Sequence, residues 1–247
     1  MKTIKNLRVV TLCSGYDSQC LALDRLHEAY PSFNYELIAW SEIDKYAIEA
    51  HNVLYPQYAD RNLGDMTKID WEKVPDFDLL TFSTPCQDIS TAGKQRGLAR
   101  DSGTRSSIVW SVLDAVRIKR PKFLLQENVK ALVSAKFLPF FHAFNYELEK
   151  MGYTTFSKVL NATDYNVPQN RERIFVFSIH NADWSYRFPE PIPLMRKLAD
   201  VLEEQVDEKY FLKDETVQKY LDKMVKNQED EKGFGFFQES LPISVEQ

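Results

Sequence analysis

The chain has 247 residues, of which 44% are hydrophobic, and a formal net charge of −5 at pH 7. This is enough for one buried core with an appendage, and the three cysteines and four histidines show no paired ligand spacing, so we expect neither a disulfide framework nor a metal site. The apolar stretch at residues 9–12 is too short for a signal peptide or a membrane span, so we expect a soluble protein of the reducing cytoplasm.

Short apolar runs alternate with amphipathic stretches along the first 180 residues. In chain order, the patterns predict a strand at 7–12, a helix at 19–29, a strand at 36–40, a helix at 44–54, a strand at 77–82, a helix at 104–119, a strand at 123–126, a helix at 137–151 and strands at 156–160 and 174–179. Strands that are joined by such helices pair in parallel through right-handed crossovers. The sequence therefore predicts an α/β fold with a doubly wound, mostly parallel sheet.

The chain changes character after the last predicted strand. Three alternating prolines interrupt the pattern at Pro189, Pro191 and Pro193. Residues 200–247 carry 13 acidic and 6 basic side chains, whereas residues 1–199 carry 23 acidic and 25 basic ones. We therefore place a domain boundary after residue 190 and expect a main domain, mildly basic overall, with a short, acidic, helix-prone C-terminal appendage.

A cysteine and two polar clusters that follow predicted strands together indicate a thiol nucleophile. Cys86 comes just after an apolar run, at the edge of the sheet where ligands of open α/β folds bind. Alone, such a cysteine is more often a small buried hydrophobe. The motifs that supply the nucleophile, an acid and an anion clamp are Thr84-Pro85-Cys86-Gln87, Glu127-Asn128-Val129 and Gln169-Asn170-Arg171-Glu172-Arg173.

Taken in order, these blocks resemble the cytosine-5 DNA methyltransferase family over residues 7–212. Two further blocks complete the family order, a strand-turn-helix opening at Leu12-Cys13-Ser14-Gly15 and an acidic strand end at Ser41-Glu42-Ile43-Asp44. The resemblance implies a Rossmann-like, S-adenosylmethionine-dependent methyltransferase fold and DNA (cytosine-5)-methyltransferase activity, as in restriction-modification systems. It makes residues 1–190 the catalytic domain and residues 191–247 a truncated or minimal segment for target recognition or partner binding.

The resemblance also implies a cofactor site at the ends of the first strands. The residues that it assigns to S-adenosylmethionine are Cys13, Ser14, Gly15, Tyr16, Ser18, Glu42, Ile43, Asp65, Met66 and Pro85. The N–H groups of the first turn would face the cofactor carboxylate, and Glu42 would accept hydrogen bonds from the ribose. The family pattern has a glycine pair where this chain has Asp17 and Ser18. We expect the charge of Asp17 to repel the cofactor carboxylate.

The family's chemistry assigns the catalytic roles to four residues. Cys86 would add to carbon 6 of cytosine and turn carbon 5 into a nucleophile. Glu127 would share a proton with ring nitrogen 3, while Arg173 and Arg171 would bind oxygen 2 and backbone phosphate. The cytosine must first be flipped out of the DNA duplex. Matching positions for a DNA-binding loop are Gln87, Ser90, Lys94 and Gln95.

Two of the family's later blocks, an Arg-x-Leu-Thr-Pro-Arg-Glu type and a Gly-Asn-Ser/Ala-Val type, are not found in this chain. We therefore expect a second polypeptide that carries the recognition domain and the last motifs, docked on an apolar patch near the first and last strands. Three alternatives stay open: a compact enzyme that reads DNA with residues 200–247, a non-catalytic regulatory or DNA-binding homologue, and an RNA cytosine-5 methyltransferase.

Overall fold

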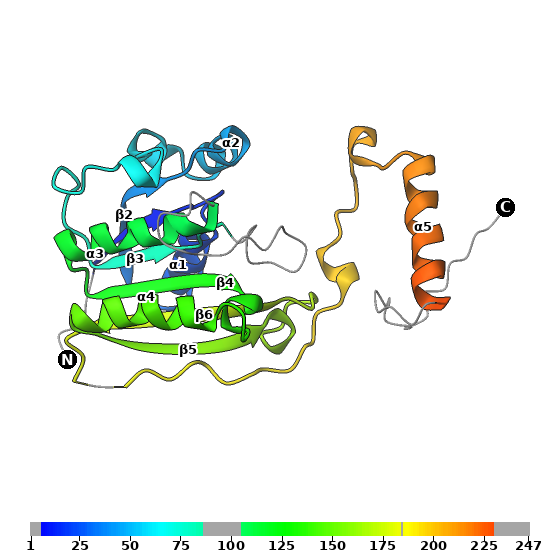
Figure 1. Ribbon diagram of the computed structural model, residues 1–247. Helices are drawn as coiled ribbons and strands as arrows, with labels where there is room; N and C mark the ends of the chain where they lie inside the picture. Colours follow the sequence, from blue (N-terminus) through cyan, green and yellow to red (C-terminus); the bar gives the residue numbers. More distant parts are fainter. Residues whose placement is uncertain (1–5, 86–104, 184, 230–247) are drawn as a thin grey trace. The chain divides into compact units, whose positions relative to one another are not determined.

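The computed structural model describes residues 6–85, 105–183 and 185–229, and the chain divides into two compact units, residues 1–196 and 197–247. The first unit is built on a six-stranded sheet with the order β2-β1-β3-β4-β6-β5 (Figure 1). The strands are β1 (Asn6–Leu12), β2 (Asn34–Ser41), β3 (Leu79–Phe82), β4 (Phe123–Val129), β5 (Tyr153–Asn161) and β6 (Glu172–His180). The α-helices are α1 (Ser18–Ala29), α2 (Lys45–Leu54), α3 (Val112–Lys119) and α4 (Leu138–Lys150).

The mostly parallel α/β sheet predicted from the sequence is confirmed, and β6 is the strand that departs from it. Strands β1 to β4 pair in parallel, whereas β6 runs antiparallel to both β4 and β5. Residues 162–171 join β5 to β6 and contain a single turn of 3-10 helix. A parallel crossover needs a dozen or more residues, so this connection forces β6 to return in the opposite direction.

Several elements differ in extent from their predictions, and β5 begins three residues before its predicted start. Within the predicted helix at 104–119, residues 105–111 form a 3-10 helix and α3 begins only at Val112. The sequence there is rich in serine and β-branched residues, which have modest α-helix propensity. Strand β4 continues three residues beyond its predicted end, to Val129, because β6 supplies hydrogen-bond partners along its whole length.

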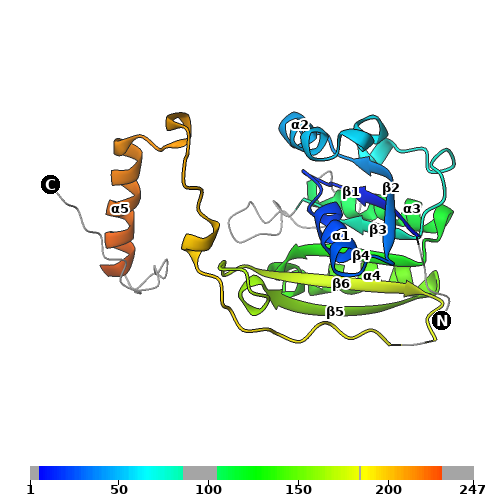
Figure 2. The same cartoon turned by 180° about the vertical axis from the view of Figure 1, so that it is seen from behind.

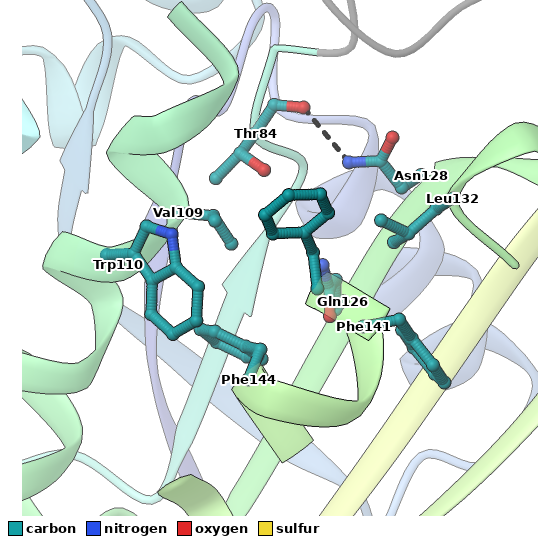
Figure 3. A pocket seen from close by; sticks show the side chains of 9 residues that line it. Thr84, Val109, Trp110, Gln126, Asn128, Leu132, Phe141 and Phe144 are labelled. Carbon is teal, nitrogen blue, oxygen red and sulfur yellow. Dashed lines mark hydrogen bonds between the residues drawn. The ribbon is translucent and has the colours of Figure 1, made fainter. Parts of the chain in front are cut away.

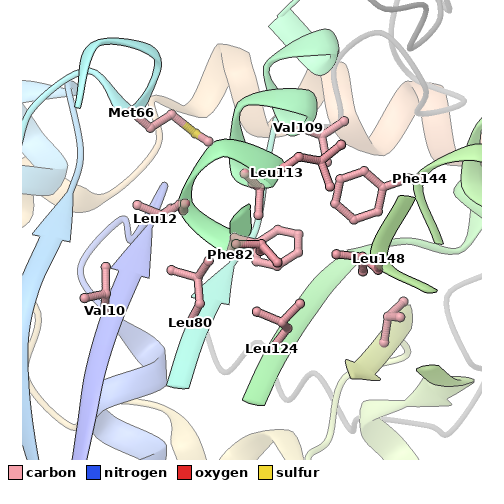
Figure 4. Close-up of a cluster of buried hydrophobic side chains, with 14 of the residues drawn as sticks. Val10, Leu12, Met66, Leu80, Phe82, Val109, Leu113, Leu124, Phe144 and Leu148 are labelled. Atoms are coloured by element: carbon pink, nitrogen blue, oxygen red, sulfur yellow. The ribbon is translucent and has the colours of Figure 1, made fainter. Parts of the chain in front are cut away.

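The main core lies between the sheet and the helices α3 and α4, which cover one face of it (Figures 1 and 4). In β4 the side chains alternate, with Leu124, Gln126 and Asn128 buried on this face. Fully buried residues from the neighbouring strands and helices include Leu12, Leu80, Phe82, Leu113 and Leu148. Burying each of these side chains contributes about 1.5–3 kcal/mol relative to leaving it exposed, so this face anchors the fold.

The opposite face carries α1 (Figure 2) and is covered less evenly. A second core cluster, which includes Val9, Leu37 and Trp40, packs around α1 near β1 and β2. Farther along the sheet the aromatic and aliphatic side chains of β4 and β6 that point to this face are only half-buried: Leu125, Phe175 and Phe177. These three residues, called the apolar floor below, leave part of the sheet face open to a ligand or partner.

The second unit contains α5 (Asp214–Glu229) and two short 3-10 turns. Along α5, apolar side chains recur every three or four residues and are exposed: Val217, Tyr220, Leu221 and Val225. In the part of the chain that the structure describes, none of the helices combines the length and apolar character that crossing a bilayer requires.

Candidate functional site

The carboxyl ends of β1, β3 and β4 meet at one edge of the sheet because these strands are parallel, and β6 begins at the same edge because it is antiparallel. A cavity of about 700 Å³ opens there, within the size range of small-molecule sites. Six of the predicted site residues line it: Cys13, Ser14, Tyr16, Ser18, Glu127 and Arg171. The edge therefore brings part of the predicted cofactor residues together with part of the predicted catalytic residues.

The first turn is shaped by backbone hydrogen bonds and by one glycine. Gly15 has a φ of +60°, the left-handed region that glycine enters without strain, while an added Cβ would meet no atom within 4 Å. Its N–H donates to Oε2 of Glu42 at 2.9 Å, and the Ser14 N–H donates to the Ser41 carbonyl at 3.2 Å. Glycine is thus needed here for the backbone angle and not for lack of space within the chain.

Glu42 links the first turn to the end of β2. Besides Gly15, it accepts the N–H groups of Ile43 at 2.8 Å and Asp44 at 3.0 Å through Oε1. Each carboxylate oxygen has two lone pairs, so Oε1 is satisfied and Oε2 can accept one more donor. Ile43 itself is 74% exposed and free to lie against a ligand. The predicted ribose and adenine contacts of these two residues stay predictions.

Asp65 and Met66 have local partners. Asp65 accepts from the hydroxyl and the N–H of Thr67 at 2.7 and 3.0 Å, and these hydrogen bonds lower the pKa of Asp65. Met66 is buried, with its Sδ 3.4 Å from the Sγ of Cys13. Burial raises the pKa of Cys13 to about 12, so this thiol is protonated at neutral pH. Neither Asp65 nor Met66 lines the cavity.

Asp17 does not face the cavity. Its side chain is fully buried, accepts a hydrogen bond from Thr11 Oγ1 at 2.7 Å, and caps α1 by accepting the Cys20 N–H at 3.3 Å. The direct repulsion of a bound carboxylate that we expected would require the side chain to point into the turn's open side. The structure turns it the other way, into the interior.

The segment that leads to the predicted nucleophile is anchored on β4. Asn128 donates from Nδ2 to the Thr84 carbonyl at 3.2 Å (Figure 3), and its Oδ1 accepts the Val129 N–H at 2.9 Å. Pro85 follows directly. The predicted nucleophile and DNA-binding residues lie outside the described residues: Cys86, Gln87, Ser90, Lys94 and Gln95. The Asn128 bond therefore fixes where this segment leaves the sheet, immediately beside Glu127.

A second, small cavity of about 20 Å³ lies under Thr84 on the α3 and α4 side (Figure 3). Its lining is mostly apolar, with Trp110 and Phe144 in edge-to-face contact. The buried Oε1 of Gln126 has no hydrogen-bond partner among the described residues. A space of this size holds one water molecule, so it completes the support of the Thr84 segment without being a ligand site.

Glu127 and Arg173 form an ion pair at the same edge of the sheet. Arg173 Nε lies 3.0 Å from Glu127 Oε1, and Arg171 Nη2 is 4.0 Å from the same oxygen. The register explains this, since Glu127 pairs with Phe175 and Arg173 is the next side chain of β6 on that face. In a parallel pairing Arg173 would lie at the far end of the sheet. All three side chains are 23–48% exposed, so a substrate can reach them.

Nine further residues that were not predicted as site residues line the cavity, among them Gln19, Ser83 and Gln169. Gln19 Nε2 donates to Ser83 Oγ at 3.3 Å and connects the start of α1 to the end of β3. Ser83 directly precedes the Thr84-Pro85-Cys86 motif and Gln169 opens the arginine block, so proximity to a motif was a usable signal for both. Gln19 had none. Among the described residues, no group of three or more His, Cys, Asp or Glu side chains is placed to hold a metal ion.

Comparisons with known proteins agree with this arrangement. A Type II methyltransferase of Lactococcus lactis subsp. cremoris, M2.ScrFI, is 48% identical over 64% of this chain and 44% of its own length. The orphan methyltransferase M.Rho11sI of Bacillus phage rho11s is 31% identical over 92% of this chain and 49% of its own length. This chain thus spans about half the length of these curated relatives. The crystal structure of S. pombe Dnmt2 methyltransferase shares the fold, with a TM-score of 0.66 and 19% identity over 87% of this chain and 66% of that one.

The family model described as C-5 cytosine-specific DNA methylase matches residues 7–245, nearly the whole chain. The match includes the first turn, Glu42, the Thr84-Pro85 segment, and the Glu127 and Arg173 pair. On this evidence the chain belongs to the C-5 cytosine-specific DNA methylase family.

Proposed function

We propose that this protein transfers a methyl group from S-adenosylmethionine to carbon 5 of a cytosine flipped out of duplex DNA. The observation that carries the proposal is the convergence at one sheet edge. The Asn128 bond to Thr84 anchors the segment that leads to Cys86 on β4, the strand that carries Glu127, and Arg173 pairs with that glutamate. The M2.ScrFI and M.Rho11sI proteins, whose names state methyltransferase activity, support the reaction type.

The residues of the first turn are compatible with S-adenosylmethionine. Ser14 Oγ is buried without a hydrogen-bond partner among the described residues, and it lies on the wall of the cavity. A buried polar atom without a hydrogen-bond partner lowers the stability of the fold unless a ligand or a water molecule binds to it. We propose that the Ser14 to Ser18 turn and Tyr16 hold the cofactor's amino-acid part, and that Glu42 accepts from its ribose. When bound, the cofactor supplies a methyl group on a sulfonium sulfur.

The protein's own side chains would prepare the cytosine. The Cys86 thiolate forms a bond to carbon 6, and ring nitrogen 3 takes a proton from the Glu127 carboxyl group as the electron pair moves through the ring. Arg173 stabilises the charge that develops on oxygen 2, because a guanidinium presents paired donors and stays charged. The ring is now an enamine, and carbon 5 is its nucleophilic atom.

The adduct is resolved after carbon 5 has taken up the methyl group. Nitrogen 3 returns its proton to Glu127. A base, for which we assign no residue, removes the carbon 5 proton, and the electron pair reforms the double bond and expels the Cys86 thiolate. The Glu127 and Arg173 pair supports this role because both side chains are partly exposed, so a flipped cytosine can reach them without any element unfolding.

Flipping the cytosine breaks its stacking and pairing in the duplex, so the protein must supply other contacts. We assign these contacts to Gln87, Ser90, Lys94 and Gln95, the positions that match the family's mobile loop. Phosphate contacts position a duplex without reading its sequence, so base readout must come from elsewhere. We propose that a second polypeptide supplies it, and that this partner packs on the apolar floor of β4 and β6. All three floor residues are half-buried, and Leu125 and Phe175 also line the cavity, so a partner seated on the floor would lie against the cavity.

The first test is the transfer of a labelled methyl group from S-adenosylmethionine to unmethylated duplex DNA, with a single-stranded RNA of the same sequence in parallel. We expect label in DNA that is lost in Cys86→Ser, while cofactor binding by calorimetry persists. Label that survives Cys86→Ser would contradict the thiol mechanism. Label that enters only the RNA would overturn the assignment of the substrate.

The proposed partner is tested by bisulfite sequencing of a plasmid incubated with this chain alone. We expect sparse methylation spread over many sequence contexts, because phosphate contacts carry no sequence information. Dense methylation of one defined sequence would contradict the need for a second polypeptide. Phe177→Asp should leave this sparse activity measurable, because Phe177 lies in the floor and does not line the cavity.

A further inference from the structure

A buried carboxylate links three elements directly beneath the first turn. Asp17 follows Gly15 and Tyr16 and adopts a φ of +67°, a backbone conformation that side-chain-bearing residues rarely take. Its Oδ2 accepts from Thr11 in β1 at 2.7 Å, its Oδ1 accepts the Cys20 N–H in α1 at 3.3 Å, and Oδ2 lies 3.7 Å from Nε2 of His51 in α2. One side chain thus contacts three separate parts of the chain.

The surroundings of Asp17 exclude water. His51 is fully buried and stacks on Trp40, with ring centroids 3.6 Å apart, and Trp40 is held by a hydrogen bond from its Nε1 to the Tyr58 carbonyl at 2.8 Å. Burial raises the pKa of Asp17 and lowers the pKa of His51. An ionisable group is costly in such a place unless partners compensate for the lost water. A carboxylate kept there needs a structural or functional reason.

The carboxylate acts on the turn through the backbone of its own residue. The Asp17 N–H donates to the Ser14 carbonyl at 2.9 Å, which closes the turn. On either side of Asp17, the side chains of Tyr16 and Ser18 line the cavity, as does Ser14. Holding Asp17 in its buried site therefore sets the direction in which these cavity residues project.

We propose that Asp17 is a positioning residue for cofactor binding, which holds the Ser14 to Ser18 turn in its ligand-binding shape by anchoring it to Thr11, Cys20 and His51. It takes the place of a glycine in the family pattern but works differently. A glycine permits the left-handed angle, whereas Asp17 enforces it through its side-chain bonds. This inference rests on the proposed use of S-adenosylmethionine.

The discriminating variant is Asp17→Gly, which restores the family's residue. If Asp17 were only a tolerated departure, glycine would relax the backbone and leave cofactor binding equal or tighter. We expect the opposite, an S-adenosylmethionine Kd at least tenfold weaker by calorimetry, with KM for the cofactor raised and kcat at saturation unchanged. Asp17→Asn should recover most of the affinity, because its amide oxygen can accept the Cys20 N–H while its NH₂ donates to Thr11 Oγ1.

Hydrogen exchange of the cofactor-free protein gives a readout that does not depend on activity. We expect the amides of residues 14–18 to exchange at least tenfold faster in Asp17→Gly than in the unaltered protein, since the turn loses its anchor. The control is Tyr153→Phe, which removes the 2.7 Å hydrogen bond from the Tyr153 hydroxyl in the edge strand β5 to the Pro121 carbonyl. It should lower stability while leaving the cofactor Kd and the exchange of residues 14–18 unchanged.

The outcomes separate this inference from the proposed function. An unaltered protein that binds no S-adenosylmethionine would contradict the proposed function itself. Normal binding with an unchanged Kd in Asp17→Gly would overturn the positioning role alone. If Asp17→Gly does not fold, Thr11→Val is the substitute, because it deletes only the hydroxyl that donates to Asp17 at nearly constant volume. A severalfold weaker Kd in that variant supports the inference, and an unchanged Kd overturns it.

Discussion

The two ends of the candidate site are held together in different ways. At the end that we propose binds the cofactor, Glu42 accepts three backbone N–H groups and supports the first turn without lining the cavity itself. At the base end, Glu127 is bonded to the guanidinium of Arg173, and both side chains are about one quarter exposed. The first carboxylate is tied to the backbone, whereas the second is tied to a side chain that can move.

This difference suits two roles: Glu42 would shape the pocket, and Glu127 would take part in the reaction. A carboxylate that accepts three backbone N–H groups would lose three hydrogen bonds by moving away, so it is suited to a fixed support of the pocket. A partly exposed ion pair can exchange a partner for a substrate atom with little loss of free energy, because such pairs contribute only about 0–1 kcal/mol. Substitutions at the cofactor end should therefore change affinity, and those at the base end should change rate.

The largest expected effect is at the base end. Glu127→Gln keeps the size and one acceptor oxygen but cannot deliver a proton, so we expect the rate of methyl transfer to fall about 100-fold or more. Cofactor affinity, measured by calorimetry, should be unchanged. Glu172→Gln is the matched control, because Glu172 lies at the same edge and pairs with Lys130 at 2.8 Å. A fall of equal size in the control would point to a general loss of charge and not to proton transfer.

A smaller effect, on cofactor affinity and not on rate, is expected at the cofactor end. Glu42→Ala leaves the Gly15 N–H without its acceptor, and losing a charge-assisted hydrogen bond of about 1.5–3 kcal/mol should weaken the cofactor Kd by about tenfold or more. The rate at saturating cofactor should stay within about twofold. The control is Glu36→Ala, which removes an ion pair between Glu36 in β2 and Arg61 in the 3-10 helix at Pro56–Arg61. A slower rate at saturation would show that the two ends are not separable.

Much of the sheet could be predicted from the sequence because buried parallel strands are short apolar runs. The run at Leu79 to Phe82 ends where the site begins, so motif residues after such runs meet at one edge. The direction of β6 could not be predicted from its composition. It depends on the length of the loop before it, and this reversal is what brings Arg173 to Glu127.

The fate of Asp17 was beyond local reasoning for a different reason. The residue type suggested a charge facing the cofactor, whereas the partners that bury it come from separate elements of the fold. His51 is 34 positions away in the chain, and its stacking on Trp40 depends on how α2 packs against β2. A pairwise contact of this kind leaves no periodic pattern, so only the folded structure reveals it.

A smaller loss of transfer rate is expected from a conservative substitution at the base end. Arg173→Lys keeps the charge but loses the fork that reaches both Glu127 and the Glu172 carbonyl. We expect transfer to slow by about fivefold, a loss of roughly 1 kcal/mol. Arg171→Lys should have less effect on the rate, because its guanidinium is 4.0 Å from Glu127. Equal losses in the two variants would mean that both arginines act through phosphate contacts.

The smallest effect is expected at the opposite edge of the sheet, where a charge pair contributes to stability alone. Burial opposes ionisation of Asp78, but three hydrogen bonds from Arg8 outweigh it and lower the pKa of Asp78. Its stabilising contribution is therefore present above the unfolded-state pKa and is lost as the pH falls through the lower, folded-state value. Asp78→Asn should reduce the free energy of unfolding by about 0.5–1 kcal/mol at pH 7, with methyl transfer unchanged.

This difference should disappear in acid, where the unaltered protein also carries a neutral Asp78, and urea unfolding at a series of pH values measures it. Asp70→Asn is the control, because the Asp70 to Lys73 pair is largely exposed and should add nothing measurable. A constant difference between Asp78→Asn and the unaltered protein at all pH values would mean that shape, and not charge, holds this edge. A loss of transfer in Asp78→Asn would mean that the two edges of the sheet are coupled, and the separation of binding wall from reacting groups would then have to include the strands that connect them.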